Sequence, residues 1–226
     1  MKNGHVEAPT CVEFIHAGPQ SPRVWDPIIA QLPGTIDAVA QTIPGISAPA
    51  PEGFSLDAAA RWVLDDLADR TDEEGVLVGI SVGALIAIRA ASLEPGLVKG
   101  LVLSAPFARS PKATLKLQRA ISSALPERVL AGPTREEGGS GITKQDLLAV
   151  LDGMAGLDLR PELYRIQCPA LVLVGGNDRG NLKGAGEVVE SMRDATLQVV
   201  PGEGHLWNES DPQRFAAAVS GWVEAL

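Results

Sequence analysis

The chain has 226 residues, of which 45% are hydrophobic and 21% charged, and its formal net charge is −9. These totals predict one globular domain, or one domain with a small insertion, and they exclude a disordered chain. The negative charge disfavours nucleic acid and anionic membranes as partners, because repulsion would replace the counterion release that favours such binding. The first ten residues lack an apolar stretch of signal-peptide length, and the apolar run around Ser81 is too short to span a bilayer. We therefore expect a cytoplasmic protein.

Short runs rich in Val, Leu and Ile recur along the chain and are bounded by turn residues. They predict six strands, at residues 11–15, 35–39, 75–78, 97–103, 170–174 and 196–200. Most of these runs are almost entirely apolar, which is typical of strands covered on both faces in a parallel sheet. Helical patterns lie between them, the clearest at residues 55–70, where apolar and acidic residues occupy opposite faces.

The C-terminal segment also predicts a helix. Asp211 is a suitable N-cap and Pro212 suits the first turn. From there Phe215, Val219, Trp222 and Leu226 form an apolar stripe. This helix is expected to pack on the sheet.

The middle of the chain breaks the alternation of strands and helices. Residues 106–165 contain no convincing strand and predict helices at 111–125 and 143–154, separated by the glycine-rich stretch 132–141. We interpret residues 1–105 and 166–226 as an α/β core with a mostly parallel sheet and helices on both faces. Residues 106–165 are then an inserted helical cap with a mobile loop.

A serine between glycines stands at the end of the third predicted strand, in Gly79-Ile-Ser-Val-Gly83. The bare pattern G-x-S-x-G is weak evidence, but here a buried strand precedes Ser81 and a helix follows it. That context is the nucleophile elbow, in which small residues allow a tight turn and the serine is held out at the carboxyl edge of the sheet. The amide of Val82 begins the helix and points toward a negative charge forming there.

A serine nucleophile needs a base, and three histidines compete for that role. His5 lies in the N-terminal segment and His16 ends the first strand, whereas His205 occupies a glycine-rich loop directly after the last strand. His205 is therefore the candidate base. Asp178 follows the penultimate strand at the same edge and is the candidate acid that orients the imidazole. Asp152 and Asp158 are fallback acids.

With Ser81, Asp178 and His205 in that order, the sequence resembles the α/β-hydrolase superfamily. The resemblance extends over most of the chain, through His16-Ala-Gly-Pro19 after the first strand, the Val24-Trp-Asp-Pro27 segment, the elbow and the strand leading to Asp178. It implies that Gly18 donates the second oxyanion amide beside Val82, and that His16 orients this loop. Ala17 departs from the glycine common at its position, which affects the expected shape of the loop.

The expected function is that of a serine hydrolase acting on a small-molecule carboxylic ester or lactone through an acyl-enzyme. A C–C bond hydrolase, a thioesterase or a biosynthetic lyase on the same scaffold remains an alternative, as does a non-catalytic small-molecule receptor. The expected substrate contacts are Trp207 beside the base and, in the cap, Leu115, Leu125, Leu148 and Met154.

No cofactor or metal is expected. The two cysteines, Cys11 and Cys168, each begin an apolar run and are interpreted as buried reduced thiols. Together with three scattered histidines they do not supply the ligand spacing of a metal site. The oligomeric state cannot be read from the sequence.

Overall fold

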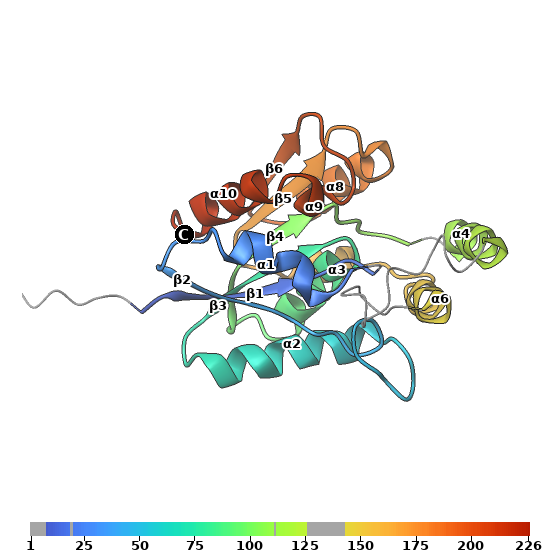
Figure 1. Cartoon of the computed structure of the whole chain (residues 1–226), viewed down its shortest axis with the longest axis horizontal. Helices are drawn as coiled ribbons and strands as arrows, with labels where there is room; N and C mark the ends of the chain where they lie inside the picture. The colour runs from blue at the N-terminus through green and yellow to red at the C-terminus, as the bar shows by residue number, and fades with distance from the viewer. Residues whose placement is uncertain (1–7, 19, 111, 126–142) are drawn as a thin grey trace, which may run out of the picture.

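The computed structural model describes residues 8–18, 20–110, 112–125 and 143–226 (Figure 1). Within these residues one sheet has the strand order β2-β1-β3-β4-β5-β6, and every neighbouring pair is parallel. The strands are β1 (Thr10–Ile15), β2 (Ile36–Ala40), β3 (Gly75–Ile80), β4 (Val98–Ser104), β5 (Ala170–Gly175) and β6 (Ala195–Val200). All six predicted strands are confirmed, with ends that differ by one or two residues.

The predicted helices are confirmed as well. The helical elements are η1 (Pro22–Trp25), α1 (Asp26–Ile29), α2 (Leu56–Arg70), α3 (Val82–Leu93), α4 (Lys112–Ala124), α6 (Lys144–Gly153), α7 (Arg160–Leu163), α8 (Arg179–Ser191), α9 (Trp207–Ser210) and α10 (Pro212–Val223). Ser55 and Asp211 cap α2 and α10, because their side chains accept hydrogen bonds from backbone amides of the first turn. Leu226 lies beyond α10 and is exposed, so the predicted apolar stripe ends before it.

Helices cover both faces of the sheet. Buried side chains of α2, α3 and α8 form one apolar cluster on one face, whereas those of α1 and α10 form a second cluster on the other face. Figure 1 shows α2 and α10 on opposite sides of the strands. None of the described helices is long and apolar enough to cross a membrane. Cys11 is buried and Cys168 partly buried, and neither is in a disulfide.

Two helices stand apart from these layers. In chain order α4 and α6 fall between β4 and β5, and in Figure 1 they lie together at one end of the molecule. Lys144, at the start of α6, donates from Nζ to the carbonyl oxygens of Ser123 and Leu125, at distances of 2.6 and 2.7 Å. This ammonium group therefore caps the C-terminal end of α4 and links the two helices.

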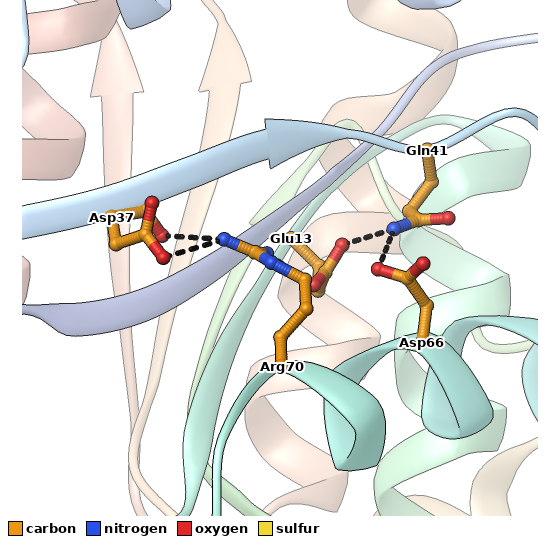
Figure 2. A network of polar contacts seen from close by, with 5 residues as sticks. All are labelled: Glu13, Asp37, Gln41, Asp66 and Arg70. Atoms are coloured by element: carbon orange, nitrogen blue, oxygen red, sulfur yellow. Dashed lines mark hydrogen bonds and ion pairs between the residues drawn. The ribbon is translucent and has the colours of Figure 1, made fainter.

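A buried carboxylate interrupts the apolar pattern of β1. Glu13 has no exposed surface and accepts hydrogen bonds from Arg70 Nη1 at 2.5 Å and from Gln41 Nε2 (Figure 2). Gln41 Nε2 also donates to Asp66, and Arg70 Nη2 donates to Asp37. Burial raises the pKa of Glu13 to about 7, although the bonds from Gln41 and Arg70 act in the opposite direction.

This raised pKa makes the stability of the fold depend on pH. The folded chain retains a proton on Glu13 up to about pH 7, whereas an unperturbed glutamate releases it near 4.5. The folded state therefore binds more protons in this window, and its stability falls as the pH rises. Glu13→Gln should flatten the decline in the free energy of unfolding over that window by roughly 1–3 kcal/mol, measured by urea denaturation at several pH values.

Asp37→Asn is the matched control, because Asp37 pairs with the same Arg70 but its side chain is 62% exposed. This variant should keep the wild-type slope. An unchanged slope in Glu13→Gln would show that another group carries the pH dependence.

Candidate active site

Ser81 occupies the corner between β3 and α3, as predicted. Its backbone has φ 55° and ψ −118°, a conformation that residues other than glycine rarely adopt. Its amide donates to the carbonyl oxygen of Ser104 at 2.9 Å, which continues the β3–β4 pairing by one residue. Among the described residues the only other non-glycine with a positive φ is Ala105, directly after β4. Both strained positions lie at the carboxyl edge of the sheet, and strain of this kind persists only where the surroundings enforce it.

The two glycines of the elbow are required by close backbone packing. A Cβ atom at Gly79 would lie 2.3 Å from the carbonyl oxygen of Gly83, and one at Gly83 would lie 2.2 Å from that of Ile15. Both distances are far inside van der Waals contact. The backbone of α3 therefore packs directly against the end of β1 and against the strand that precedes it.

Asp178 is held by contacts between the loops after β5 and β6. A Cβ atom at Gly175 would lie 2.3 Å from the carbonyl oxygen of Gly204, so the two loops touch through their backbones. Asn177 joins them further, because its amide donates to the carbonyl oxygen of Glu203 and its side chain to that of Gly202, both at 2.8 Å. These contacts bring Asp178 beside His205.

The imidazole of His205 is oriented by Asp178. Its Nδ1 lies 2.7 Å from Asp178 Oδ2, so the Nδ1 proton is donated to the carboxylate and Nε2 remains available as an acceptor. The Asp178 side chain is 9% exposed and that of His205 is 40% exposed. The imidazole thus has a buried partner on one side and access to solvent on the other.

Asn181 is a further residue of this site that the sequence did not indicate. It lies in the first turn of α8, and its Nδ2 donates to both oxygens of Asp178, each at 2.9 Å. The same nitrogen lies 3.1 Å from His205 Nδ1. Asn181 therefore fixes the orientation of the carboxylate that fixes the imidazole.

Ser81 and His205 are not hydrogen-bonded to each other in this structure. Within the described part of the chain, neither Ser81 Oγ nor His205 Nε2 has a hydrogen-bond partner. Ser81 is partly exposed. Contacts of this kind are often long without substrate and shorten when it binds.

The predicted oxyanion donors lie on α3 and after β1. Val82 is the first residue of α3, so its amide has no carbonyl partner within the helix. Gly18 follows β1 and does not have a positive φ, and the same is true of Ala17. Ala17 is therefore accommodated without strain where glycine was expected.

His16 orients this loop as the sequence suggested. It is fully buried, with Nδ1 2.8 Å from the carbonyl oxygen of Ala17 and Nε2 2.8 Å from Ser47 Oγ. Burial lowers the pKa of His16 to about 4, so the ring is neutral near pH 7. Nδ1 donates to the carbonyl and Nε2 accepts from the hydroxyl, which excludes His16 as a free base.

Side chains of α6 cover Gly18. A Cβ atom at Gly18 would be in ordinary contact with Leu147 Cδ1 at 3.8 Å, Val82 Cγ1 at 3.9 Å and Val150 Cγ1 at 4.0 Å. Leu147 and Val150 were not predicted as site residues. Their helical spacing alone cannot tell which face of α6 meets the loop after β1.

The predicted substrate contacts have different environments. Leu115 and Met154 are buried in the core cluster that contains α3, and Leu148 packs against that cluster while partly buried. Leu125 is half-buried just after α4. Whether these four contact substrate stays a prediction.

Trp207, two residues after the predicted base, lies in the core. It is 1% exposed, its Nε1 donates to Ser104 Oγ at 2.9 Å, and its ring packs 4.6 Å from that of Phe215. Through these two contacts Trp207 connects the segment after His205 to β4 and α10. Whether Trp207 contacts substrate stays a prediction.

The remaining candidates do not join the site. Asp152 is paired with Arg119, and Asp158 is paired with Arg160. His5 and the glycine-rich stretch 132–141, with its predicted mobile loop, lie outside the described residues. Asp178 is accordingly the acid that the structure brings to His205.

Comparisons with known proteins identify the family of the chain. A family model described as "Alpha/beta hydrolase family" matches residues 14–218. The pimeloyl-[acyl-carrier protein] methyl ester esterase of Chromobacterium violaceum is 31% identical over 211 residues, covering 80% of this chain and 82% of the relative. The biotin biosynthesis bifunctional protein BioHC of Cellvibrio japonicus is 25% identical over 242 residues. The match covers 94% of this chain but 47% of that protein, so the chain spans about half the length of this relative.

Solved structures share the same fold. The enol-lactonase from Burkholderia xenovorans superposes with a TM-score of 0.79 at 16% sequence identity, covering 98% of this chain and 93% of the lactonase. At this identity the similarity concerns the fold alone.

The packing of α3 on β1 predicts a large effect of a small substitution. Gly83→Ala places a methyl group against the Ile15 carbonyl, so α3 must shift. The free energy of unfolding should fall by roughly 3 kcal/mol or more, measured by urea denaturation. Gly221→Ala in α10 is the control, because a Cβ there meets no atom within 4 Å and should leave stability unchanged or slightly raised. A Gly83→Ala protein as stable as wild type would contradict the close packing.

Proposed function

Because the chain belongs to the alpha/beta hydrolase family, we propose that it is a serine hydrolase that cleaves a carboxylic ester or lactone. Ser81 is the nucleophile, His205 the general base and Asp178 the acid that orients it. The amides of Val82 and Gly18 form the oxyanion hole. Residues 106–165 form a cap over this site. The expected cytoplasmic location rests on the sequence alone.

One observation carries the proposal. The imidazole of His205 is held through Nδ1 by a largely buried carboxylate 27 residues away, and its Nε2 is left without a partner among the described residues. Two further features support a catalytic role for this histidine. The loops that carry Asp178 and His205 touch through their backbones at Gly175, and Asn181 donates a hydrogen bond to the Asp178 carboxylate. A surface histidine without a catalytic role would need neither. The parallel sheet brings Ser81 to the same edge as this pair.

The reaction begins with the attack of Ser81 Oγ on the substrate carbonyl carbon while His205 Nε2 takes the hydroxyl proton. The carbonyl oxygen becomes an oxyanion, which accepts hydrogen bonds from the amides of Val82 and Gly18. When the intermediate collapses, His205 returns the proton to the departing alkoxide oxygen and the acyl group stays on Ser81. Water then attacks the acyl-enzyme with the same base, which releases the acid and restores the serine. Asp178 remains ionised throughout and stabilises the imidazolium.

The relatives favour an ester among the possible bonds. The name of the Chromobacterium violaceum relative describes a methyl ester esterase acting on a pimeloyl group on acyl carrier protein. An acyl methyl ester is therefore a suitable first substrate to test. Thioesters, activated C–C bonds and lyase substrates pass through related chemistry, so they belong in the same substrate panel.

Labelling with a fluorophosphonate tests the nucleophile directly. The reagent should modify Ser81, identified by peptide mapping, and Ser81→Ala should lower kcat on a nitrophenyl ester by at least about 1,000-fold with folding unchanged. Modification at another residue would exclude this mechanism.

A second outcome separates an enzyme from a receptor. If the wild type binds small esters but neither turns them over nor reacts with the reagent, and Ser81→Ala binds equally well, the non-catalytic alternative holds. The panel of short and long acyl esters, lactones and thioesters then also identifies the bond cleaved, by comparing kcat/KM.

Asn181 should contribute to the rate through Asp178. Asn181→Leu keeps the volume but removes both hydrogen bonds to the carboxylate, so the imidazole is less well oriented. We expect kcat to fall by about tenfold on the best ester while KM changes little. Lys183→Leu on the same helix is the control, because Lys183 is exposed and, among the described residues, has no hydrogen bond or ion pair with Asp178. Equal kcat values in the two variants would exclude a positioning role.

A further inference from the structure

We propose that Gln20 is a positioning residue that fixes the oxyanion loop and fastens it to the segment carrying His205. The inference rests on the proposed function, because it concerns the Gly18 amide as an oxyanion donor. Gln20 is 5% exposed, and its side-chain amide lies between the loop after β1 and helix α9. Neither the family pattern quoted for this loop nor the predicted triad involves it.

On the side of the loop, Gln20 binds residue 17 twice. The amide of Ala17 donates to Gln20 Oε1 at 3.0 Å, and the amide of Gln20 donates to the carbonyl oxygen of Ala17 at 3.1 Å. His16 Nδ1 lies 2.8 Å from the same carbonyl oxygen. Both polar backbone groups of Ala17 are therefore held.

Holding this carbonyl orients the Gly18 amide. The carbonyl of Ala17 and the N–H of Gly18 belong to one peptide unit, which is planar and trans, so the two groups point in opposite directions. Because the carbonyl is directed at His16 and Gln20, the N–H is directed away from them. A rotation of this peptide plane would turn the proposed oxyanion donor away from the site.

On the other side, Gln20 reaches the segment after His205. Its Nε2 donates to Asn208 Oδ1 at 3.2 Å and to Glu209 Oε1 at 2.6 Å, and both acceptors lie in α9. Asn208 is fully buried. One amide thus connects two segments that are 188 residues apart in sequence and that follow β1 and β6, strands on either side of β3.

The chemistry of this position calls for an amide. Gln20 uses one acceptor and both hydrogens of its Nε2, which a carboxylate or an apolar side chain cannot reproduce. Loss of the side chain would leave the buried Ala17 amide and Asn208 oxygen unpaired, and buried polar groups without partners are costly. The loop would then relax into another arrangement, and the Gly18 amide would move with it.

The test measures the oxyanion hole itself. Wild type, Gln20→Leu and Gln20→Asn are compared on a nitrophenyl ester and on its thionoester, in which sulfur replaces the carbonyl oxygen. An oxyanion hole stabilises the negative oxygen more than the larger sulfur, so the oxygen-to-sulfur ratio of kcat/KM reports its alignment. Gln20→Leu should lower kcat on the oxygen ester by about 10- to 100-fold with KM little changed, and it should lower the ratio as well.

A second set of variants exchanges the amide of Gln20 and the carboxylate of Glu209. It tests their contact separately from any loss of stability. Gln20→Glu places a carboxylate against Glu209, so activity should fall through repulsion. Adding Glu209→Gln supplies a donor opposite the new carboxylate, so the double variant should be clearly more active than Gln20→Glu. It should stay below wild type, because Asn208 Oδ1 still lacks the donor that Gln20 provides. Glu209→Gln alone should keep most of the activity, because its amide oxygen can still accept from Gln20.

The outcomes separate this inference from the proposed function. If the wild type hydrolyses esters and labels at Ser81 but Gln20→Leu keeps the wild-type oxygen-to-sulfur ratio, Gln20 acts only through folding and the inference fails alone. A double variant no more active than Gln20→Glu leads to the same conclusion. If the wild type shows neither turnover nor labelling, the proposed function fails and the inference fails with it.

Discussion

The close packing of α3 against the end of β1 is the constraint on which the rest of the site depends. Gly83 approaches the Ile15 carbonyl so closely that a single methyl group has no room. Gly83 lies two residues after Ser81, and Ile15 lies two residues before Ala17. One contact therefore sets both the strained turn at the nucleophile and its separation from the loop that contains Gly18. Apolar residues on both sides of β3 and α3 are fully buried and hold the turn in place.

A close backbone contact at a glycine also shapes the part of the site that contains Asp178 and His205. Gly175 at the end of β5 contacts the Gly204 carbonyl, so the loops that carry Asp178 and His205 meet through their backbones. Asn177 adds two hydrogen bonds across this junction. A side chain at Gly175 would separate the acid from the base, whereas a Cβ atom at Gly204 would meet no atom within 4 Å. Close approach of the backbones at a glycine can thus bring together two loops that follow parallel strands.

The sequence predicted the parts of the molecule that have a periodic or positional signal. Six apolar runs became six strands, and because the sheet is parallel, Ser81, Asp178 and His205 lie at its carboxyl edge, where His205 contacts Asp178. Gln20, Asn181 and Leu147 had no such signal, because each acts through a partner distant in sequence or on an unknown helix face. The burial of Trp207 also had no such signal, because an aromatic residue in a loop can face solvent or core, and its contacts with Ser104 and Phe215 place it in the core. Glu13 was hidden inside an apolar strand.

Two kinds of interaction therefore position the proposed catalytic groups, and substitutions that disrupt them have different consequences. Backbone contacts at glycines are part of the core, so disturbing them unfolds or displaces an element of the sheet. Buried amide networks lie above the sheet, and disturbing them leaves the core intact while a loop changes its arrangement. Stability measurements alone would detect the first kind and overlook much of the second. Rate measurements on a folded variant separate them, because the transition state is sensitive to small displacements of a donor that the folded core tolerates.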